Sequence, residues 1–257
     1  GLRQSYDSKN AGARTLSVDA GYTISDGNGG ANYTVVSSAA GGNIAKADLQ
    51  VSGARAASRA YDGTTVALVT GGSVSALGSD SVTLDPTMAV GAFGDKNVGA
   101  GKAVTVSGYA LNGADAGNYM VVQPTGQTAS ITPRLVTVNG LAANDKTYDG
   151  TTGVTIANWG TVNTGAAGET LTLNPGTAVF DDRNAGLNKT VTASGYSLAD
   201  GAGGGLAGNY QLSSTKATAA ASIAPARLAI SGVTAADKVY DGTTAVTLSG
   251  GAVQALG

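Results

Sequence analysis

Apolar and polar residues alternate with a period of two along short stretches of this chain. In residues 135–140, LVTVNG, Val136 and Val138 occupy positions that we expect to face inward, while Thr137 faces outward. Such alternation predicts half-buried β-strands. The same pattern recurs twice, with Leu49 and Val51 flanking Gln50, and with Leu228 and Ile230 flanking Ala229.

Further alternating stretches are separated by turns rich in Gly, Asn and Asp. They cover residues 102–111, 118–123, 128–133 and 170–174. About seven strands fit into a unit of about 90 residues, which is typical of a β-sandwich. The sequence therefore predicts an all-β fold of tandem, Ig-like antiparallel β-sandwiches.

The motif Tyr-Asp-Gly-Thr-Thr occurs three times, and other landmarks recur in step with it. Tyr61, Tyr148 and Tyr240 open the three copies and are separated by 87 and 92 residues. The tyrosines of AGY or SGY and the Asn-Tyr pairs keep nearly the same spacing. Four of the extra residues in the longer unit lie between Tyr196 and Tyr210. Insertions gather in surface loops, so we expect a loop there.

Prolines indicate where one repeat ends and the next begins. Pro133 and Pro225 follow the last inward Ile of a unit and come just before a new strand. Their fixed φ suits a stiff junction, so the repeats are expected to form an elongated rod. The predicted domains are the C-terminal part of a repeat at 1–46, complete repeats at 47–133 and 134–225, and the N-terminal part of a repeat at 226–257. Cuts near residues 78 and 165 are the alternative.

Composition removes several classes of function. The chain of 257 residues has no His and no Cys, and its one Glu is Glu169. Imidazole-based catalysis and thiolate metal sites are therefore excluded, and we expect no enzyme activity and no cofactor. A net charge of −2 with scattered Lys and Arg argues against nucleic acid, and the lack of an apolar run of about 18 residues argues against membrane insertion. Because the chain starts without a signal-like segment, we expect it to be part of a longer protein.

The three Tyr-Asp-Gly motifs have a structural and a ligand-binding interpretation. In the first, Asp-Gly forms a tight turn, Thr-Thr starts a strand, and the Tyr buries its ring and bonds its hydroxyl to nearby backbone. In the second, the Tyr and Asp face solvent and recognise a sugar. The candidate ligand-binding residues are Tyr61, Asp62, Tyr148, Asp149, Tyr240 and Asp241. The structural interpretation is favoured.

Three further features carry possible chemistry. Trp159 is the only Trp, and either stacks on a sugar or packs in a core or interface. Asp26 and Asn28 in SDGNGG resemble part of a calcium loop, although a solvated turn is favoured and no metal is predicted. Lys146 and Lys238, two residues before the Tyr, are expected to pair with a loop Asp rather than to form an isopeptide bond.

As a set, these motifs resemble the YDG-type and related MBG repeat domains of large secreted bacterial adhesins, in the filamentous-haemagglutinin or two-partner-secretion style. The residues that carry the resemblance are KTYDGTT and DKVYDGTT, DAGNY with its relatives GGANY and LAGNY, and ITPRL and IAPARL. The first unit departs from the pattern, because Lys46 replaces the Pro and SRAYDG lacks the Asp of DKTYDG.

The resemblance implies export to the bacterial cell surface and a role in attachment, aggregation or biofilm. We therefore expect a non-enzymatic spacer segment whose partners are neighbouring repeats of the same longer chain, and in addition a polysaccharide or another adhesin copy. The alternative is a module that binds glycans or matrix polysaccharides. Exposure of the three motif tyrosines would separate the two hypotheses.

Overall fold

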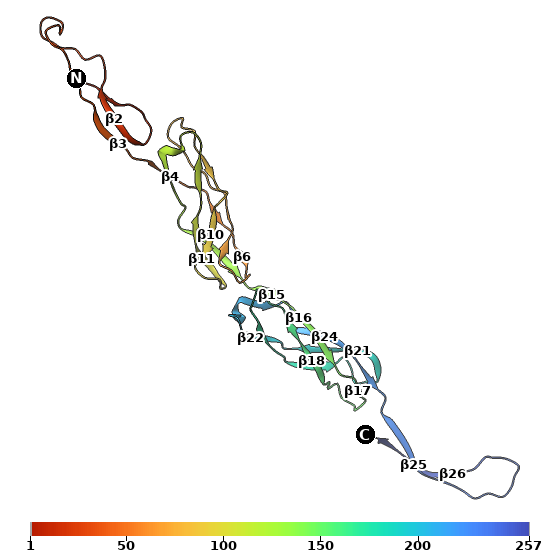
Figure 1. Cartoon of the computed structure of the whole chain (residues 1–257). Coiled ribbons are helices and arrows are strands. Elements are labelled where there is room, and N and C mark those ends of the chain that lie inside the picture. The colour runs from red at the N-terminus through yellow and green to blue at the C-terminus, as the bar shows by residue number, and fades with distance from the viewer. Residues whose placement is uncertain (1, 257) are drawn as a thin grey trace. The chain divides into compact units, whose positions relative to one another are not determined.

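The computed structural model describes residues 2–256 and consists of β-strands with two single-turn 3-10 helices (Figure 1). The all-β fold class expected from the sequence is confirmed. The chain divides into two compact units, Gly1–Thr132 and Pro133–Gly257. In the part that the structure describes, no helix is long and apolar enough to cross a membrane.

The first unit contains a small sheet and a complete repeat. The small sheet is antiparallel, in the order β1-β2-β3, with β1 at Gln4–Tyr6, β2 at Gly12–Val18 and β3 at Ala40–Ile44. The elements of the repeat are β4 Ala47–Gln50, β5 Arg55–Ala56, β6 Arg59–Ala60, β7 Val66–Ala67, β8 Val69–Thr70, β9 Thr83–Asp85, β10 Val90–Phe93, β11 Gly99–Ser107, β12 Ala110–Asn112, η1 Ala116–Asn118, β13 Tyr119–Val122 and β14 Gln127–Thr132.

The second unit contains another complete repeat and then a two-stranded ribbon. Its elements are β15 Arg134–Val136, β16 Val138–Ala143, β17 Lys146–Thr147, β18 Ile156–Val162, β19 Leu171–Asn174, β20 Thr177–Phe180, β21 Gly186–Ser194, β22 Ser197–Asp200, η2 Ala207–Asn209, β23 Tyr210–Leu212, β24 Lys216–Ala224, β25 Arg227–Ala235 and β26 Leu248–Leu256. The predicted insertion lies in the loop between β22 and η2.

Both complete repeats use one pairing scheme, made of several small sheets. The largest sheets have the orders β6-β14-β11-β10-β7 and β17-β24-β21-β20. Most strand pairs are antiparallel as expected, but β4 pairs with β13, β6 with β14, β15 with β23 and β17 with β24 in parallel. Strands that open a repeat thus lie beside strands that close it and run in the same direction.

The core of the second unit is small and follows the predicted alternation. Phe180, Val191, Ala221 and Ile223 form a buried cluster, in which Val191 of β21 has no exposed surface. Successive side chains of a strand point to opposite faces, so the neighbours of these residues along β21 and β24 remain outside the cluster. Burial of each large apolar side chain contributes about 1.5–3 kcal/mol.

The expected inward positions are confirmed in the complete repeats and wrong in the last strand pair. Leu49, Val51 and Val136 are buried and Val138 is half-buried, whereas Leu228 and Ile230 of β25 are 64% and 72% exposed. Here β25 pairs with β26 in an isolated antiparallel hairpin. A two-stranded ribbon has no second layer to cover its apolar residues.

Candidate functional site

The Tyr-Asp-Gly-Thr-Thr turn of the second repeat is closed by its own side chains. The Asp149 carboxylate accepts hydrogen bonds from the Thr151 N–H and hydroxyl, both at 2.9 Å. The Lys146 ammonium donates to the same carboxylate at 2.8 Å and to the Thr151 carbonyl oxygen at 2.9 Å. It also lies 5.7 Å from the centre of the Phe180 ring. We call this basic residue, Asp and Thr the clasp.

The clasp is formed in all three motif copies. In the last copy, Lys238 donates to Asp241 at 2.8 Å, and Asp241 accepts from the N–H of Thr243 at 3.0 Å. In the first copy, the guanidinium of Arg59 pairs with Asp62 and lies 5.5 Å from the centre of the Phe93 ring. The expected pairing of Lys146 and Lys238 with a loop Asp is therefore confirmed.

A second hydrogen bond explains the departure of the first motif from the others. In the second repeat, the Asp145 carboxylate accepts from the N–H of Ser222 at 2.6 Å. In the first repeat, Ser58 replaces this Asp, and its hydroxyl accepts from the N–H of Ser130 at 2.9 Å. Both side chains tie the segment before the motif to the last strand of the repeat, so SRAYDG and DKTYDG make equivalent contacts.

The clasp predicts acid-sensitive stability. The hydrogen bond from Lys146, supported by those from Thr151, lowers the pKa of Asp149 from 3.8 to about 2. A carboxyl whose pKa is lower in the folded state stabilises the fold above its unfolded pKa and loses this contribution as the pH falls towards the folded value. We therefore expect Asp149→Asn to lower the urea midpoint at pH 6 and to change it little near pH 2. The exposed Leu187 offers a control, since Leu187→Ala removes no titratable group and should change the midpoint equally at both pH values. An equal deficit at both pH values would contradict this expectation.

The glycine of the motif adopts the backbone conformation expected from the sequence. Gly63, Gly150 and Gly242 have φ of 82°, 80° and 73°. A Cβ added at Gly150 would meet no atom within 4 Å, so only backbone strain opposes substitution. We expect Gly150→Val to cost about 1–3 kcal/mol. Gly150→Asn should cost less, because Asn tolerates positive φ. Equal urea midpoints for the Val variant and the wild type would contradict the turn.

The three motif tyrosines differ in exposure. Tyr61 is 1% exposed, Tyr148 is 40% exposed and Tyr240 is 92% exposed. The expectation that each ring is buried is therefore wrong for Tyr148 and Tyr240. The N–H of Tyr148 is held by the Ala224 carbonyl oxygen at 2.8 Å, which fixes the backbone and leaves the ring partly open. Tyr240 lies in the loop of the β25–β26 hairpin.

Other tyrosines make the hydroxyl-to-backbone bond that we assigned to the motif tyrosine. Tyr109 and Tyr196, from the SGY sequences, are each 3% exposed. Their hydroxyls donate to the carbonyl oxygens of Gly71 at 2.7 Å and Trp159 at 2.8 Å. The regular spacing of SGY marked these tyrosines, but only the structure identifies their partners.

In the two complete repeats, the tyrosine of the Asn-Tyr pair is bonded to an acid, which sequence reasoning missed. The Tyr119 hydroxyl donates to Asp80 at 2.8 Å, and the Tyr210 hydroxyl donates to Glu169 at 2.7 Å. Burial raises the pKa of Tyr119, whereas a hydrogen bond from Lys9 lowers the pKa of Asp80. Each acid lies about 40 residues before its tyrosine, beyond the range of local patterns.

Trp159 makes a packing contact. It lies half-buried on β18, and its ring meets that of Tyr196 edge-on, with centres 6.3 Å apart and planes at 79°. Aromatic rings favour this arrangement.

Asp26 and Asn28 form a turn rather than converging on a common point. One Asp26 oxygen accepts from the N–H groups of Asn28 at 2.9 Å and Gly30 at 2.8 Å, and the Asn28 side chain donates to Asn32. These hydrogen bonds lower the pKa of Asp26, and the bond from the Gly30 N–H has the largest effect. Among the residues that the structure describes, no group of three or more acidic, His or Cys side chains is placed to hold a metal ion.

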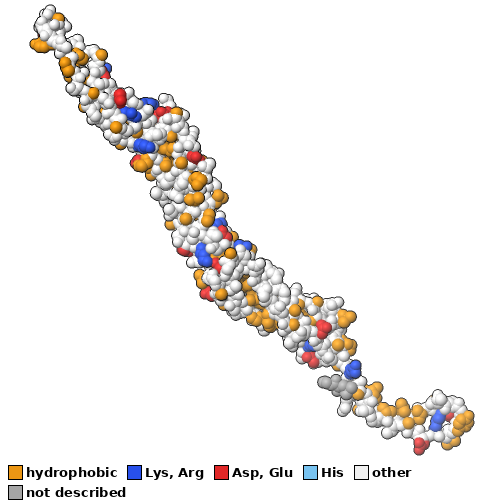
Figure 2. All heavy atoms as spheres, viewed as in Figure 1, with side chains coloured by type: hydrophobic (Ala, Val, Ile, Leu, Met, Phe, Trp, Pro, Cys, Tyr) orange, Lys and Arg blue, Asp and Glu red, His pale blue; other side chains and the backbone are white. Residues whose placement is uncertain are grey.

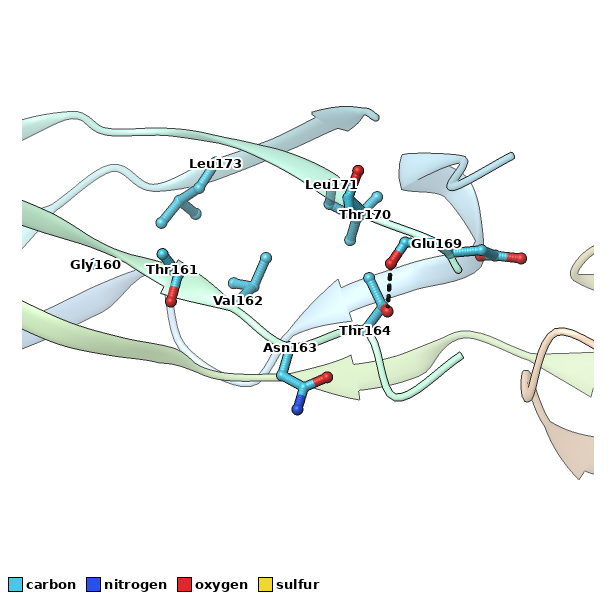
Figure 3. Close-up of a pocket in the computed structure, with 9 residues that line it drawn as sticks. All are labelled: Gly160, Thr161, Val162, Asn163, Thr164, Glu169, Thr170, Leu171 and Leu173. Carbon is cyan, nitrogen blue, oxygen red and sulfur yellow. Dashed lines mark hydrogen bonds between the residues drawn. The ribbon is translucent and has the colours of Figure 1, made fainter. Parts of the chain in front are cut away.

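A shallow hollow of about 540 Å³ lies between β18 and β19 (Figure 3). The side chains of Val162, Leu171 and Leu173 point into it, while the side chain of Glu169 extends away from them (Figure 3). The Thr164 hydroxyl donates to the Glu169 backbone carbonyl oxygen at 2.9 Å. The Glu169 carboxylate is bonded to Tyr210, and the rest of the lining mixes apolar side chains with those of Thr and Asn.

Charges on the face shown in Figure 2 are scattered. On the face shown in Figure 2, Lys and Arg lie singly or beside acidic side chains. Nucleic-acid binding relies on clustered cations that contact successive phosphates. The face shown offers no such stripe.

Recurrent strands, clasps and tyrosine bonds define a tandem all-β repeat protein. A model of the YDG domain family matches residues 45–128, 132–219 and 224–257. These ranges cover most of the chain, and the chain therefore belongs to the YDG domain family. No curated protein and no solved structure gives a significant match to it.

Proposed function

We propose that this chain is a non-enzymatic spacer segment of a secreted bacterial adhesin, acting at the cell surface in attachment, aggregation or biofilm formation. The observation that carries the proposal is the clasp. In each copy, the motif Asp is bonded to the Thr two residues later and paired with the basic residue three before it. The most distinctive residues of the repeat thus stabilise the repeat itself.

The short connections between repeats also support the spacer role. Single-residue or two-residue connections separate β14 from β15 and β24 from β25, and each contains a Pro. Short Pro-containing linkers restrict hinge motion. Tandem Ig-like repeats joined in this way form the elongated rod that we propose, suited to holding an adhesive tip away from a cell.

A glycan-binding module is the second candidate, favoured by one specific observation. A hollow of about 580 Å³ is lined by Tyr148, Asp149, Asn184 and Leu228, among others. The 40% exposed ring of Tyr148 offers a face on which a sugar could stack. Repeated weak sites of this kind would gain strength through avidity.

A binding screen separates the two candidates. The chain and its Tyr148→Ala and Asp149→Asn variants would be tested against bacterial matrix polysaccharides and host glycans by calorimetry, beside their unfolding midpoints. The spacer proposal predicts no saturable binding by the wild type and a lower unfolding midpoint for Asp149→Asn. Saturable binding that a folded Tyr148→Ala variant loses would overturn it in favour of the glycan module.

A further inference from the structure

The first unit contains a junction between the end of one repeat and the following repeat. The loop between β1 and β2 contacts the complete repeat through three hydrogen bonds, and Lys9 also pairs with Asp115 at 3.9 Å. The Lys9 ammonium pairs with Asp80 at 2.7 Å. The N–H of Ala11 donates to the side-chain oxygen of Asn118 at 2.8 Å, and the Asn118 amide donates to the Asn10 side chain at 3.2 Å. Tyr119 holds Asp80 in place through its hydroxyl.

The same loop recurs at the end of the second complete repeat. Arg183, Asn184 and Ala185 lie 174 residues after Lys9, Asn10 and Ala11, between β20 and β21. All three are exposed. Among the residues that the structure describes, they make none of the three bonds found at the first junction.

The surroundings of this second loop match those of the first. Asn184 and Ala185 line the 580 Å³ hollow together with Ala226. Asn118 and Tyr119 line the corresponding hollow at the first junction, together with Ala11 and Ala47. Ala226 is the counterpart of Ala47 in the next repeat. Leu228 also lines the second hollow and is exposed, although its counterpart Leu49 is buried by the pairing of β4 with β13.

We propose that Arg183, Asn184 and Ala185 form a docking surface for the acid, Asn and Tyr at the facing end of a third YDG repeat in the same polypeptide. Residues 226–257 are the counterpart of 47–78, with 17 of 32 positions identical. In a third repeat that continues like the first complete repeat, the counterpart of Asp80 lies two positions after the counterpart of Gly78. The positive Arg183 is complementary to that acid, as Lys9 is to Asp80.

This docking depends on the repeat geometry and holds whether or not the chain is a spacer. It assigns the hollow beside Tyr148 to a protein partner rather than to a sugar. It also predicts that β25 exchanges part of its hairpin pairing for a parallel pairing like that of β4 with β13, which would cover Leu228.

The test extends the chain after Gly257 with a second copy of residues 79–132, which completes a third repeat. Amide hydrogen exchange at Ala185 is the direct readout, and Ala11 is the internal reference because its N–H is already bonded to Asn118. We expect Ala185 to exchange at the open rate in the original chain and at least about tenfold more slowly in the extended chain, since exchange reports local opening.

Coupling between side chains provides the second readout. In the extended chain, Arg183→Ala and an Ala substitution in the appended copy of Asp80 should each lower the folding constant of the third repeat. Their coupling should be about two- to fivefold, as for exposed ion pairs. In the original chain, Arg183→Ala should leave the unfolding midpoint unchanged. The exposed Lys216 provides a control cation, because Lys216→Ala should have no coupling in either chain.

Three results would overturn the proposal. The first is a folded third repeat with Ala185 still unprotected. The second is an appended segment that stays unfolded while residues 1–257 unfold as before, because docking should help to order it. The third is protection of Ala185 that rises with protein concentration, which would assign the surface to another molecule.

Discussion

Phe180→Ala is expected to lower the free energy of unfolding of the second unit by about 3–5 kcal/mol, as aromatic truncations in cores do. The Phe180 ring is 2% exposed and packs with Val191 and Ile223. It also lies under the ammonium of Lys146, so the same truncation removes one wall of the clasp. Fluorescence of Trp159, the only Trp of the chain, reports urea unfolding of this unit directly.

An exposed residue on the next strand provides a matched control for the loss of stability in Phe180→Ala. Leu187, on β21, is 83% exposed. Leu187→Ala should change the free energy of unfolding by no more than about 0.5 kcal/mol, as surface substitutions do. Similar midpoints for Phe180→Ala and Leu187→Ala would show that the buried cluster does not stabilise the unit.

Gly108→Ala is expected to destabilise the first unit by about 3 kcal/mol or more, because backbone strain and steric overlap act together. Gly108 has a φ of 89°, and an added Cβ would lie 1.9 Å from the carbonyl oxygen of Met88. This oxygen belongs to backbone and cannot move aside like the end of a side chain. Far-UV circular dichroism during urea unfolding, with hydrogen exchange of β10 and β11, would measure the loss.

Gly195→Ala measures the cost of backbone strain without the steric overlap that arises at Gly108. Gly195 precedes Tyr196 as Gly108 precedes Tyr109, and its φ is 81°. An added Cβ there would lie 3.5 Å from Gly176, an ordinary contact. We expect a cost of about 1–2 kcal/mol from the left-handed backbone alone. Equal losses at the two glycines would contradict the overlap argument.

Local features of the fold could be predicted from the sequence because neighbouring residues determine them. The alternation around Val136 identifies a strand, and Asp-Gly identifies a turn in which Gly150 takes positive φ. The Lys146 pair with Asp149 spans three residues, so its partners lie within one motif. Constant landmark spacing also identified the repeated framework and its insertion loop.

Features that depend on distant segments could not be predicted. The parallel pairing of β17 with β24 joins residues about 77 positions apart, which no local pattern encodes. Tyr61, Tyr148 and Tyr240 share one motif but differ in exposure, because burial depends on what surrounds each turn. The acid partners of Tyr119 and Tyr210 were missed for the same reason.

The clasp explains why a conspicuous motif need not be a binding site. A carboxylate that accepts three hydrogen bonds from its own turn would have to release them before binding a sugar hydroxyl. Breaking these bonds would leave the Lys146 ammonium and the Thr151 N–H and hydroxyl without their acceptor, which costs free energy. Repetition of the motif is therefore expected wherever the turn is repeated, with or without a ligand.

Small-angle X-ray scattering of the 257-residue chain tests the spacer proposal most directly. Repeats about 30–40 Å long, from strands of 8–10 residues, would give a rod of about 100 Å for nearly three repeats. The radius of gyration would then be about 30 Å, whereas a compact domain of this length has about 18 Å. The account predicts the larger value with a scattering profile of a stiff rod. A value near that of a compact domain, or a profile of freely bending segments, would contradict it.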